Sequence, residues 1–291
     1  CRMTQDILTG FIATASQARH ESIEIIRNFG NHQESLSDTI SIEEPLEIRI
    51  AGPDFDETTL TITMRTPGQD HELSLGFIYS EGIISTFDDV ADVEHCRPPS
   101  IERGIHNAIC ITLAPHVSFN QDQLRRNFYT NSGCGVCGKT SIESVLAKPA
   151  LPLKNEFSIS SKQIKQLPVC LRELQTEFPI TGGIHAAGLI NNEGRIVMVR
   201  EDIGRHNAID KLIGAKLLAH ELPLKTEGLM LSGRAGFELV QKAVLAGAEF
   251  LSAIGPPSSL SISLAEEAGM TLAGFANDRG FNLYTHPQRV R

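Results

Sequence analysis

Residues 229–276 have the sequence LMLSGRAGFELVQKAVLAGAEFLSAIGPPSSLSISLAEEAGMTLAGFA, and this stretch indicates the fold class. Short apolar runs of strand length alternate in it with longer segments of helix length. In chain order these segments are 229–231, 237–248, 250–254, 259–268 and 270–276. Alternation of this kind is typical of a layered sheet with helices on its faces. The sequence therefore predicts an α/β fold for this part of the chain.

The residues before this stretch continue the pattern. Two apolar runs within 186–199 flank the turn Asn191–Gly194 and predict a pair of strands. The segment 205–221 is predicted to be an amphipathic helix, because its apolar residues fall on one face. A further helix is predicted over 160–177, which Pro168 is expected to bend or split.

The N-terminal part of the chain has a different character. Strand-like alternation occurs at 46–50 and at 59–64, on either side of a turn at Gly52–Asp54. A helix is predicted over 72–84 and a short apolar strand over 108–113. Together these elements predict a small α+β unit.

These patterns divide the chain into three predicted parts. Residues 1–37 are polar and irregular, and we expect a loosely ordered extension. Residues 38–130 are predicted to form the small α+β domain, and residues 131–291 the larger domain, with a cysteine loop at its start.

Composition narrows the range of functions. The chain has 291 residues, of which 41% are hydrophobic, as in ordinary globular proteins. Its formal net charge of -9 argues against a general nucleic-acid binder, which normally carries a basic surplus. The apolar run 7–15 is interrupted by polar residues and has no basic leader, so we expect neither a signal peptide nor a membrane span. We therefore expect a cytoplasmic protein whose cysteines are reduced.

Two cysteines, Cys134 and Cys137, lie in the glycine-rich segment NSGCGVCGK at 131–139. Glycines make the backbone easy to bend, so the two sulfurs are expected at an accessible tip. Lys139 and the N-terminus of a helix predicted to begin near Thr140 favour the thiolate. Because only the thiolate is a good nucleophile, this loop is a candidate for sulfur chemistry.

Other kinds of site compete for this cysteine pair. The glycines at 133–138 match GxGxxG, but no apolar strand precedes them, as the dinucleotide-binding motif requires. A structural zinc site needs four ligands, and Cys96, Cys110 and Cys170 are isolated in the sequence. The chain has no Trp of the kind that usually accompanies a thioredoxin-type pair, and flanking glycines argue against two inert core cysteines. The remaining interpretation is sulfur transfer, in which one of the two thiolates accepts a sulfane sulfur as a persulfide and its neighbour helps to retain it or pass it on.

Four polar, glycine-containing segments fall at successive connections between predicted elements. They are 181–185, 200–207, 232–236 and 274–280. A strand end followed by a glycine turn and a helix N-terminus suits an anion such as phosphate, and Arg205 and Arg234 could add bidentate contacts. Ser232 could contribute its hydroxyl there or only cap the next helix. Such loops gather at the carboxyl edge of an open sheet, so the sequence predicts a shared pocket.

Each of these residues also has a structural explanation when it is taken alone. Arg205 could simply pair with Asp210 or Glu201. His206 is equally well explained as a structural histidine or as a ligand contact, whereas His185 is better explained as structural. The predicted site therefore depends on the four segments together.

Six strings in the chain match those of a known family. They are IEEPLEIR at 42–49, CGVCGK at 134–139, TGGIH at 181–185, VREDIGRHN at 199–207, LSGR at 231–234 and NLYTH at 282–286. Their order, from about residue 38 to the C-terminus, is far more specific than a CxxC motif. The sequence resembles the FdhD family, the formate dehydrogenase accessory sulfurtransferases.

This resemblance implies a cytidine-deaminase-like layered α/β core with a smaller N-terminal α+β domain, in a homodimer. It implies that a cysteine desulfurase loads sulfur onto Cys134 as a persulfide, with Cys137 as its partner. The sulfur then passes to the molybdenum of a bis(molybdopterin guanine dinucleotide) cofactor, bound as cargo for formate dehydrogenase. The resemblance implies no structural metal.

The resemblance also assigns a cofactor-binding stretch near the C-terminus. In this chain the stretch consists of Phe275, Ala276, Asn277, Asp278, Arg279 and Gly280. The guanine dinucleotide cargo gives a purpose to the phosphate-binding candidates Ser232, Arg234, Arg205 and His206. Two departures stand out: Gly236 replaces a serine usual in the family, and residues 277–280 read NDRG where relatives more often have an arginine–glycine arrangement.

A deaminase-like fold does not make the chain a deaminase. Deamination requires an H-x-E motif upstream of P-C-x-x-C, but the H-x-E of this chain is His32–Glu34, and Gly133 precedes Cys134. Two rival functions remain open: a non-catalytic chaperone that shields the cofactor, and a redox protein that cycles a Cys134–Cys137 disulfide.

Overall fold

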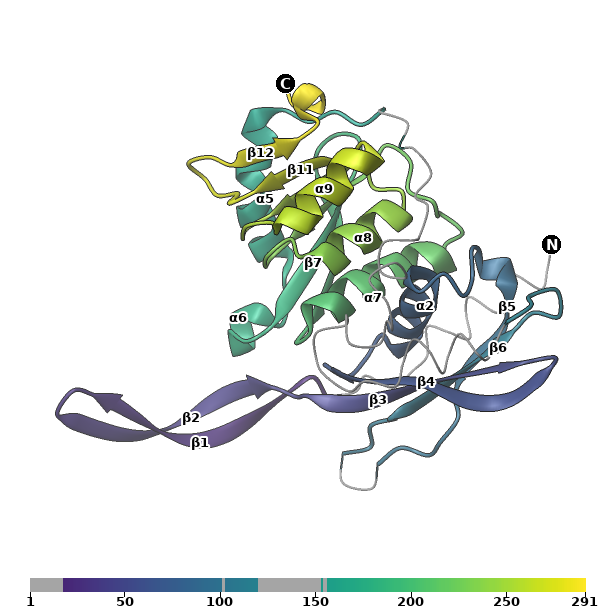
Figure 1. Cartoon of the computed structure of the whole chain (residues 1–291). Coiled ribbons are helices and arrows are strands. Elements are labelled where there is room, and N and C mark those ends of the chain that lie inside the picture. The colour runs from purple at the N-terminus through teal and green to yellow at the C-terminus, as the bar shows by residue number, and fades with distance from the viewer. Residues whose placement is uncertain (1–17, 101–102, 120–152, 154–155) are drawn as a thin grey trace.

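The computed structural model describes residues 18–100, 103–119, 153 and 156–291. Its frame consists of a six-stranded sheet, a four-stranded sheet and a two-stranded ribbon. Figure 1 shows helices packed over the two larger sheets and the ribbon extending away from them. The predicted mixed α/β class is confirmed.

The six-stranded sheet has the strand order β12-β11-β10-β9-β7-β8. Its strands are β7 (His185–Ile190), β8 (Ile196–Asp202), β9 (Gly228–Leu231), β10 (Phe250–Ala253), β11 (Thr271–Gly274) and β12 (Asn282–Thr285). Strands β9, β10 and β11 are parallel, whereas β12 is antiparallel to β11 and the β7–β8 hairpin joins β9 in antiparallel register. The carboxyl ends of the three parallel strands therefore lie at the same edge as the start of β7.

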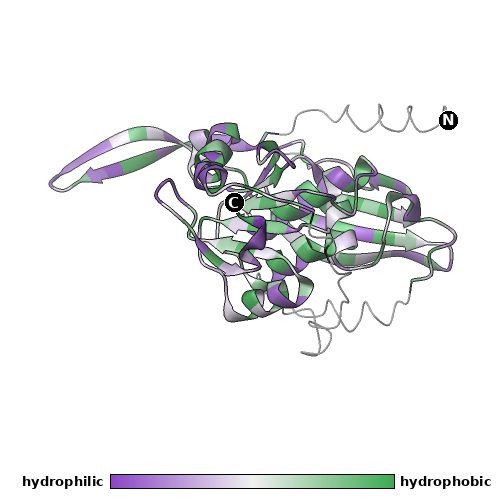
Figure 2. Ribbon diagram, turned by 90° about the horizontal axis from the view of Figure 1, so that it is seen from above, coloured by the Kyte–Doolittle hydropathy of each residue, from purple (hydrophilic) through white to green (hydrophobic). Residues whose placement is uncertain are grey.

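Helices cover both faces of this sheet (Figure 1). They are α7 (Arg205–Leu218), α8 (Phe237–Leu245) and α9 (Ser259–Ala268) on one face, and α5 (Ser161–Leu174) on the other. Side chains alternate between the faces along a strand. Leu229 and Leu231 accordingly pack with α7, α8 and α9, while Met230 packs with α5. Figure 2 shows how hydrophobic residues concentrate in this layered body.

The four-stranded sheet has the order β4-β3-β6-β5. Its strands are β3 (Glu44–Gly52), β4 (Phe55–Arg65), β5 (Val90–His95) and β6 (Ala108–Leu113). Strands β3 and β4 form the predicted hairpin around Gly52–Asp54, and β3 runs parallel to β6. Helix α2 (Asp70–Ser80) covers one face of this sheet and buries Leu73, Leu75 and Ile78 against it.

Helices α2 and α7 join the two sheets. They cross where Gly76 faces α7 and Gly214 faces α2, so closely that no side chain fits at either position. A Cβ atom on Gly76 would lie 2.7 Å from the carbonyl carbon of Asp210, and one on Gly214 would lie 2.6 Å from that of Glu72. Leu217 of α7 belongs to the core of the four-stranded sheet. The two sheets therefore share one continuous interior.

The ribbon corrects the prediction of an irregular extension up to residue 37. Strands β1 (His20–Phe29) and β2 (His32–Ser41) pair in antiparallel register along their whole length. Ile25 lies opposite Leu36, on the ribbon face that also carries Ile23. Charged and polar residues dominate both strands, so the alternation of period two was hidden by low overall hydropathy.

The base of the ribbon is fixed to the short helix α6 (Phe178–Thr181) and the residue before it. His20 Nδ1 lies 3.1 Å from Glu177 Oε2, and the Ser41 hydroxyl donates to Thr181 Oγ1 at 2.8 Å. These contacts attach the ribbon to the part of the chain that leads into the six-stranded sheet. In the sequence, however, the ribbon directly precedes the four-stranded sheet. The division into three domains stays a prediction.

The prediction that α7 is amphipathic is wrong. The helix is buried on nearly all sides, because the large sheet covers one side and α2 covers another. Asp210, Lys211 and Lys216 are buried within it, and each is paired with an opposite charge. The charged residues suggested a solvent face, but each of them is paired in the interior with an opposite charge from outside α7.

Three smaller differences concern helix and strand positions. Helix α2 begins and ends earlier than the predicted 72–84. Helix α5 is not split at Pro168, because Leu167 and Leu171 hold both sides of the proline in the core. Strands β5 and β12 were not predicted. Among the described helices, none has the length and hydropathy needed to cross a membrane.

Candidate functional site

Three loops meet where the parallel strands end. They are 232–236 after β9, 254–258 after β10 and 275–280 after β11. Backbone hydrogen bonds join each loop to the next: Gly255 donates to Gly233 at 2.9 Å, and Phe275 donates to Gly255 at 3.3 Å. The structure therefore brings together Ser232, Arg234 and the predicted stretch from Phe275 to Gly280, as the carboxyl-edge argument anticipated.

The remaining predicted residues, Arg205 and His206, are at the same edge. Strand β8 ends at Asp202, which pairs with His185 at the start of β7, and α7 begins at Arg205. Since β7 is antiparallel to β9, His185 is next to Ser232, and these two side chains approach within 3.5 Å between Nδ1 and Oγ. The edge thus gathers segments that are far apart in the sequence.

The alternative structural roles of Arg205 and Ser232 do not hold. Asp210 is paired with Lys242, and the Glu201 carboxylate accepts backbone N–H bonds from Thr176, Glu177 and Phe178. Neither acid contacts Arg205. Ser232 does not cap α8, whose N-cap is Gly236.

Unpaired positive charge remains at this edge. Arg205 is half-buried and Arg234 is exposed, and neither guanidinium has an ion pair or a side-chain hydrogen bond within the described residues. The nearby acids are already committed: Asp202 lies 2.7 Å from Lys211 Nζ, and Glu238 lies 2.9 Å from His206 Nε2. Burial, Arg205 and His206 lower the pKa of His185. On a chain of net charge -9, this edge is suited to an anion.

Glu238 is a site residue that the sequence did not reveal. It stands in the first turn of α8 and its Oε2 atom holds His206, while its buried Oε1 atom has no hydrogen-bond partner within the described part of the chain. Its approach to His206 depends on the packing of α8 beside α7, a long-range contact without a local sequence signal.

Asn277 shapes the C-terminal loop. Its side chain donates to the carbonyl of Phe275 at 2.9 Å and accepts the N–H groups of Arg279 and Gly280 at 2.9 and 3.2 Å. Its amide is therefore used inside the loop. Phe275 has a φ of 53° and is 47% exposed, whereas Ala276 is buried under the loop. The exposed side chains of this stretch are those of Phe275, Asn277, Asp278 and Arg279.

The cysteines of the predicted sulfur loop, Cys134 and Cys137, lie outside the described residues. Within them, Cys96, Cys110 and Cys170 are free thiols. Burial raises the pKa of Cys110 to about 11, so this thiol is poorly suited to act as a nucleophile. No group of three or more potential ligands that could hold a metal ion occurs in the described part of the chain.

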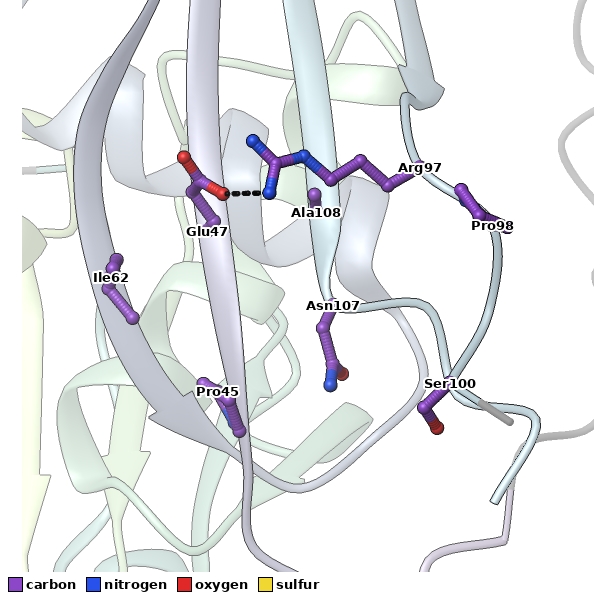
Figure 3. A pocket seen from close by; sticks show the side chains of 8 residues that line it. All are labelled: Pro45, Glu47, Ile62, Arg97, Pro98, Ser100, Asn107 and Ala108. Atoms are coloured by element: carbon purple, nitrogen blue, oxygen red, sulfur yellow. Dashed lines mark ion pairs between the residues drawn. The ribbon is translucent and has the colours of Figure 1, made fainter. Parts of the chain in front are cut away.

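A pocket of about 290 Å³ lies elsewhere, on the four-stranded sheet (Figure 3). It is lined by Pro45, Glu47, Ile62, Arg97, Pro98, Ser100, Asn107 and Ala108. Its arginine, Arg97, is paired with Glu47 at 3.5 Å, so its charge is already balanced. None of the predicted site residues lines this pocket, and we place the candidate site at the edge of the large sheet.

The loop packing at this edge gives a direct test. A Cβ atom on Gly255 would lie 3.0 Å from Arg234 Cα and 3.1 Å from its backbone nitrogen. Gly255→Ala should push the Arg234 loop outward and weaken binding of inorganic pyrophosphate about tenfold, which corresponds to about 1.4 kcal/mol. Titration calorimetry measures this.

The matched control is Gly236→Ala, at the other end of the same loop, where a Cβ atom meets nothing within 4 Å. It should bind pyrophosphate within about twofold of the unmodified chain, a difference below about 0.5 kcal/mol. Equal affinity of all three proteins would mean that the Arg234 loop does not contact the anion.

Comparison with known proteins places this geometry in a family. The sequence profile of the FdhD/NarQ family matches residues 41–291, which include all three edge loops. The chain belongs to the FdhD/NarQ family. Members with the name sulfur carrier protein FdhD include one from Mycolicibacterium paratuberculosis, 43% identical over 255 residues, covering 87% of this chain and 92% of that protein.

A second FdhD protein supports this membership, and a crystal structure supports the fold. The sulfur carrier protein FdhD of Streptomyces coelicolor is 41% identical and covers 93% of this chain and 95% of its own length. The crystal structure of a protein from Desulfotalea psychrophila, described as a formate dehydrogenase accessory protein, has a TM-score of 0.70 and 21% identity. It covers 94% of this chain and 100% of that protein. At this identity the crystal structure supports the FdhD-type fold.

Proposed function

We propose that this chain is a sulfurtransferase that matures formate dehydrogenase. It accepts sulfur from a cysteine desulfurase as a persulfide on Cys134 and transfers it, with the help of Cys137, to the molybdenum cofactor. The cofactor, a bis(molybdopterin guanine dinucleotide), is its substrate and cargo. The observation that carries this proposal is membership of the FdhD/NarQ family over residues 41–291, together with relatives named as sulfur carriers.

The loading step requires one nucleophile. The Cys134 thiolate attacks the terminal sulfur of the desulfurase persulfide, the donor's S–S bond breaks, and the donor cysteine leaves as a thiolate. Cys134 then carries the extra sulfur. The sequence around it supports this step, because Lys139 and the flanking glycines favour an accessible thiolate.

The sheet edge is the proposed cofactor site. The guanidinium groups of Arg205 and Arg234, which have no ion pair within the described residues, could bind the diphosphate, and His206 lies beside them with its Nε2 held by Glu238. Phe275 offers an exposed aromatic face on which a guanine base could stack. Asn277 would act indirectly by keeping the loop in shape, with Asp278, Arg279 and Gly280 on its outer side. Ala276 would contribute through its backbone alone.

Several finer points belong to the same proposal. We propose a cytoplasmic homodimer that meets both a cysteine desulfurase and formate dehydrogenase. We also propose a cytidine-deaminase-like layering of the core, which the order β8-β7-β9-β10-β11, an antiparallel hairpin followed by parallel strands, supports. The rival function is a chaperone that binds the cofactor and never carries sulfur covalently.

Intact-protein mass spectrometry after incubation with a cysteine desulfurase and cysteine tests the proposal. The unmodified chain should gain roughly 32 Da, the mass of one sulfur, and lose it on reduction. Cys134→Ala should abolish the gain and should also abolish maturation of formate dehydrogenase.

The control is Cys170→Ala, which changes a thiol on α5, far along the chain from the loop. It should gain sulfur as the unmodified chain does. An undiminished gain in Cys134→Ala would assign the sulfur to another cysteine. No gain in any form, with a desulfurase shown to be active, would favour the chaperone.

A further inference from the structure

His185 is placed to respond to an anion at the sheet edge. It is the first residue of β7, half-buried, and the loop after β9 passes beside its ring. A Cβ atom on Gly233 would lie 3.4 Å from His185 Nδ1, so the backbone of this loop is in close contact with the imidazole. The anion-binding loop and His185 therefore form one packed unit.

The hydrogen bonds of Ser232 support one tautomer of His185. Ser232 Oγ accepts the N–H of Ala186 at 2.8 Å, so its own proton must point to a different acceptor. His185 Nδ1 lies 3.5 Å away and is the other hydrogen-bond partner of this hydroxyl in the described part of the chain. We therefore assign the serine proton to the bond with Nδ1, which leaves a neutral imidazole with its own proton on Nε2.

The charges around His185 keep it neutral while the site is empty. Arg205 and His206 approach from α7, and Arg234 belongs to the adjoining loop. Asp202 of β8 offsets them only in part, because it is held by Lys211, and Glu238 of α8 is held by His206. Burial and the neighbouring Arg205 and His206 thus lower the pKa of His185 and disfavour its imidazolium. A bound phosphate would reverse this balance.

We propose that His185 and Ser232 form a proton-coupled donor pair for the phosphate groups of the ligand. When the phosphate binds, His185 takes up one proton from solvent at Nδ1. The new Nδ1–H then donates to Ser232 Oγ, and the Ser232 hydroxyl turns to donate to the phosphate. One proton thus adds a positive charge and frees a hydroxyl donor at the same moment. This inference rests on the proposed nucleotide site and adds a ligand-linked residue to it.

Linkage fixes the sign of the pH dependence. Because the ligand-bound form holds more protons than the empty form, binding weakens as pH rises through the range in which His185 titrates. Burial, Arg205 and His206 hold the pKa of His185 below its ordinary value in the empty site, and a bound phosphate would raise it, so each unit of that rise weakens binding by up to about tenfold as pH increases. A site without this coupling would show a flat profile.

Calorimetry on the full chain with GDP-mannose tests the pair. Both phosphates of this diphosphate diester stay ionised near neutral pH, so any proton uptake comes from the protein. Titrations in two buffers of different ionisation enthalpy should show an uptake approaching one proton per nucleotide. His185→Gln, which can still hydrogen-bond to Ser232 but does not titrate, should bind more weakly at low pH and show little uptake. Thermal melting of each variant verifies that it is folded.

Two further variants separate the alternatives. His220→Gln changes an exposed histidine just past the far end of α7 and should retain the full uptake. Uptake that disappears in His206→Gln and persists in His185→Gln would overturn the proposal, as would binding without uptake. Absence of any binding would contradict the nucleotide site itself, so the two failures are distinct.

Discussion

Gly214→Ala is expected to destabilise the protein by about 3 kcal/mol or more. The added Cβ would overlap the backbone of α2, since it would lie 2.6 Å from the carbonyl carbon of Glu72. No flexible side chain can move aside there, so α2 and α7 must separate along their whole contact. The core residues on both sides, Leu73 on α2 and Leu217 on α7, would lose packing together.

Helix propensity alone predicts the opposite sign for this substitution. Alanine is favoured over glycine in a helix by about 1 kcal/mol, so without the clash Gly214→Ala would stabilise α7. The control is Ala215→Gly, one residue further along, which should cost about 1–2 kcal/mol through lower helix propensity and the loss of one buried methyl group. Urea denaturation gives both free energies of unfolding. A Gly214→Ala protein as stable as the unmodified chain would mean that the two helices are not in backbone contact.

Lys211→Met should cost about 3 kcal/mol through the loss of one buried charge. Lys211 and Asp202 are both inaccessible to solvent, and their charged atoms are 2.7 Å apart. Lys211 Nζ also donates to the carbonyl of Thr66 at 3.0 Å. Without the lysine, Asp202 would keep its hydrogen bonds from Thr66, Gly204 and Asn207 but would have no compensating charge. An uncompensated buried carboxylate is strongly unfavourable.

A second lysine on α7 provides the control for this prediction. Lys216 is also buried, but its partners Glu221 and Glu227 have side chains that are 58% and 18% exposed, so water can still reach the acids left behind, and Lys216→Met should cost less, about 1–2 kcal/mol. The double variant Lys211→Met with Asp202→Asn should recover part of the loss, because it removes the unpaired charge. If Lys211→Met and Lys216→Met lowered the free energy of unfolding equally, the complete burial of the Lys211–Asp202 pair would not add to its contribution to stability.

The sequence was most informative where local signals agree. Helix α9 spans the predicted residues 259–268, because Ser258 caps its start and Gly269 ends it in the left-handed conformation. The parallel strands were equally predictable from the sequence, since an apolar run as short as that of β9 is too short to form a helix. The edge location of Ser232, Arg234 and Phe275–Gly280 followed from their position after these strands.

The features that were missed depend on contacts between distant segments. The neighbourhood of His185 and Ser232 arises from the antiparallel pairing of β7 with β9, and that of His206 and Glu238 from the packing of two helices. Lys211 is buried by contacts with Asp202 at the end of β8 and with Thr66, which follows β4. Such contacts leave no periodicity in the local sequence. The roles of Cys134 and Cys137 stay predictions from the family resemblance.

The crossing of α2 and α7 also has a consequence for how the chain is made. About 125 residues separate the end of α2 from the start of α7. At ordinary rates of translation, synthesis of that interval takes on the order of ten seconds. Strands β5 and β6 are made early in this interval, and the four-stranded sheet then has no α7 to complete its interior, while the glycine face of α2 is open to solvent. A nascent chain therefore exposes an unfinished core until its second half has emerged from the ribosome.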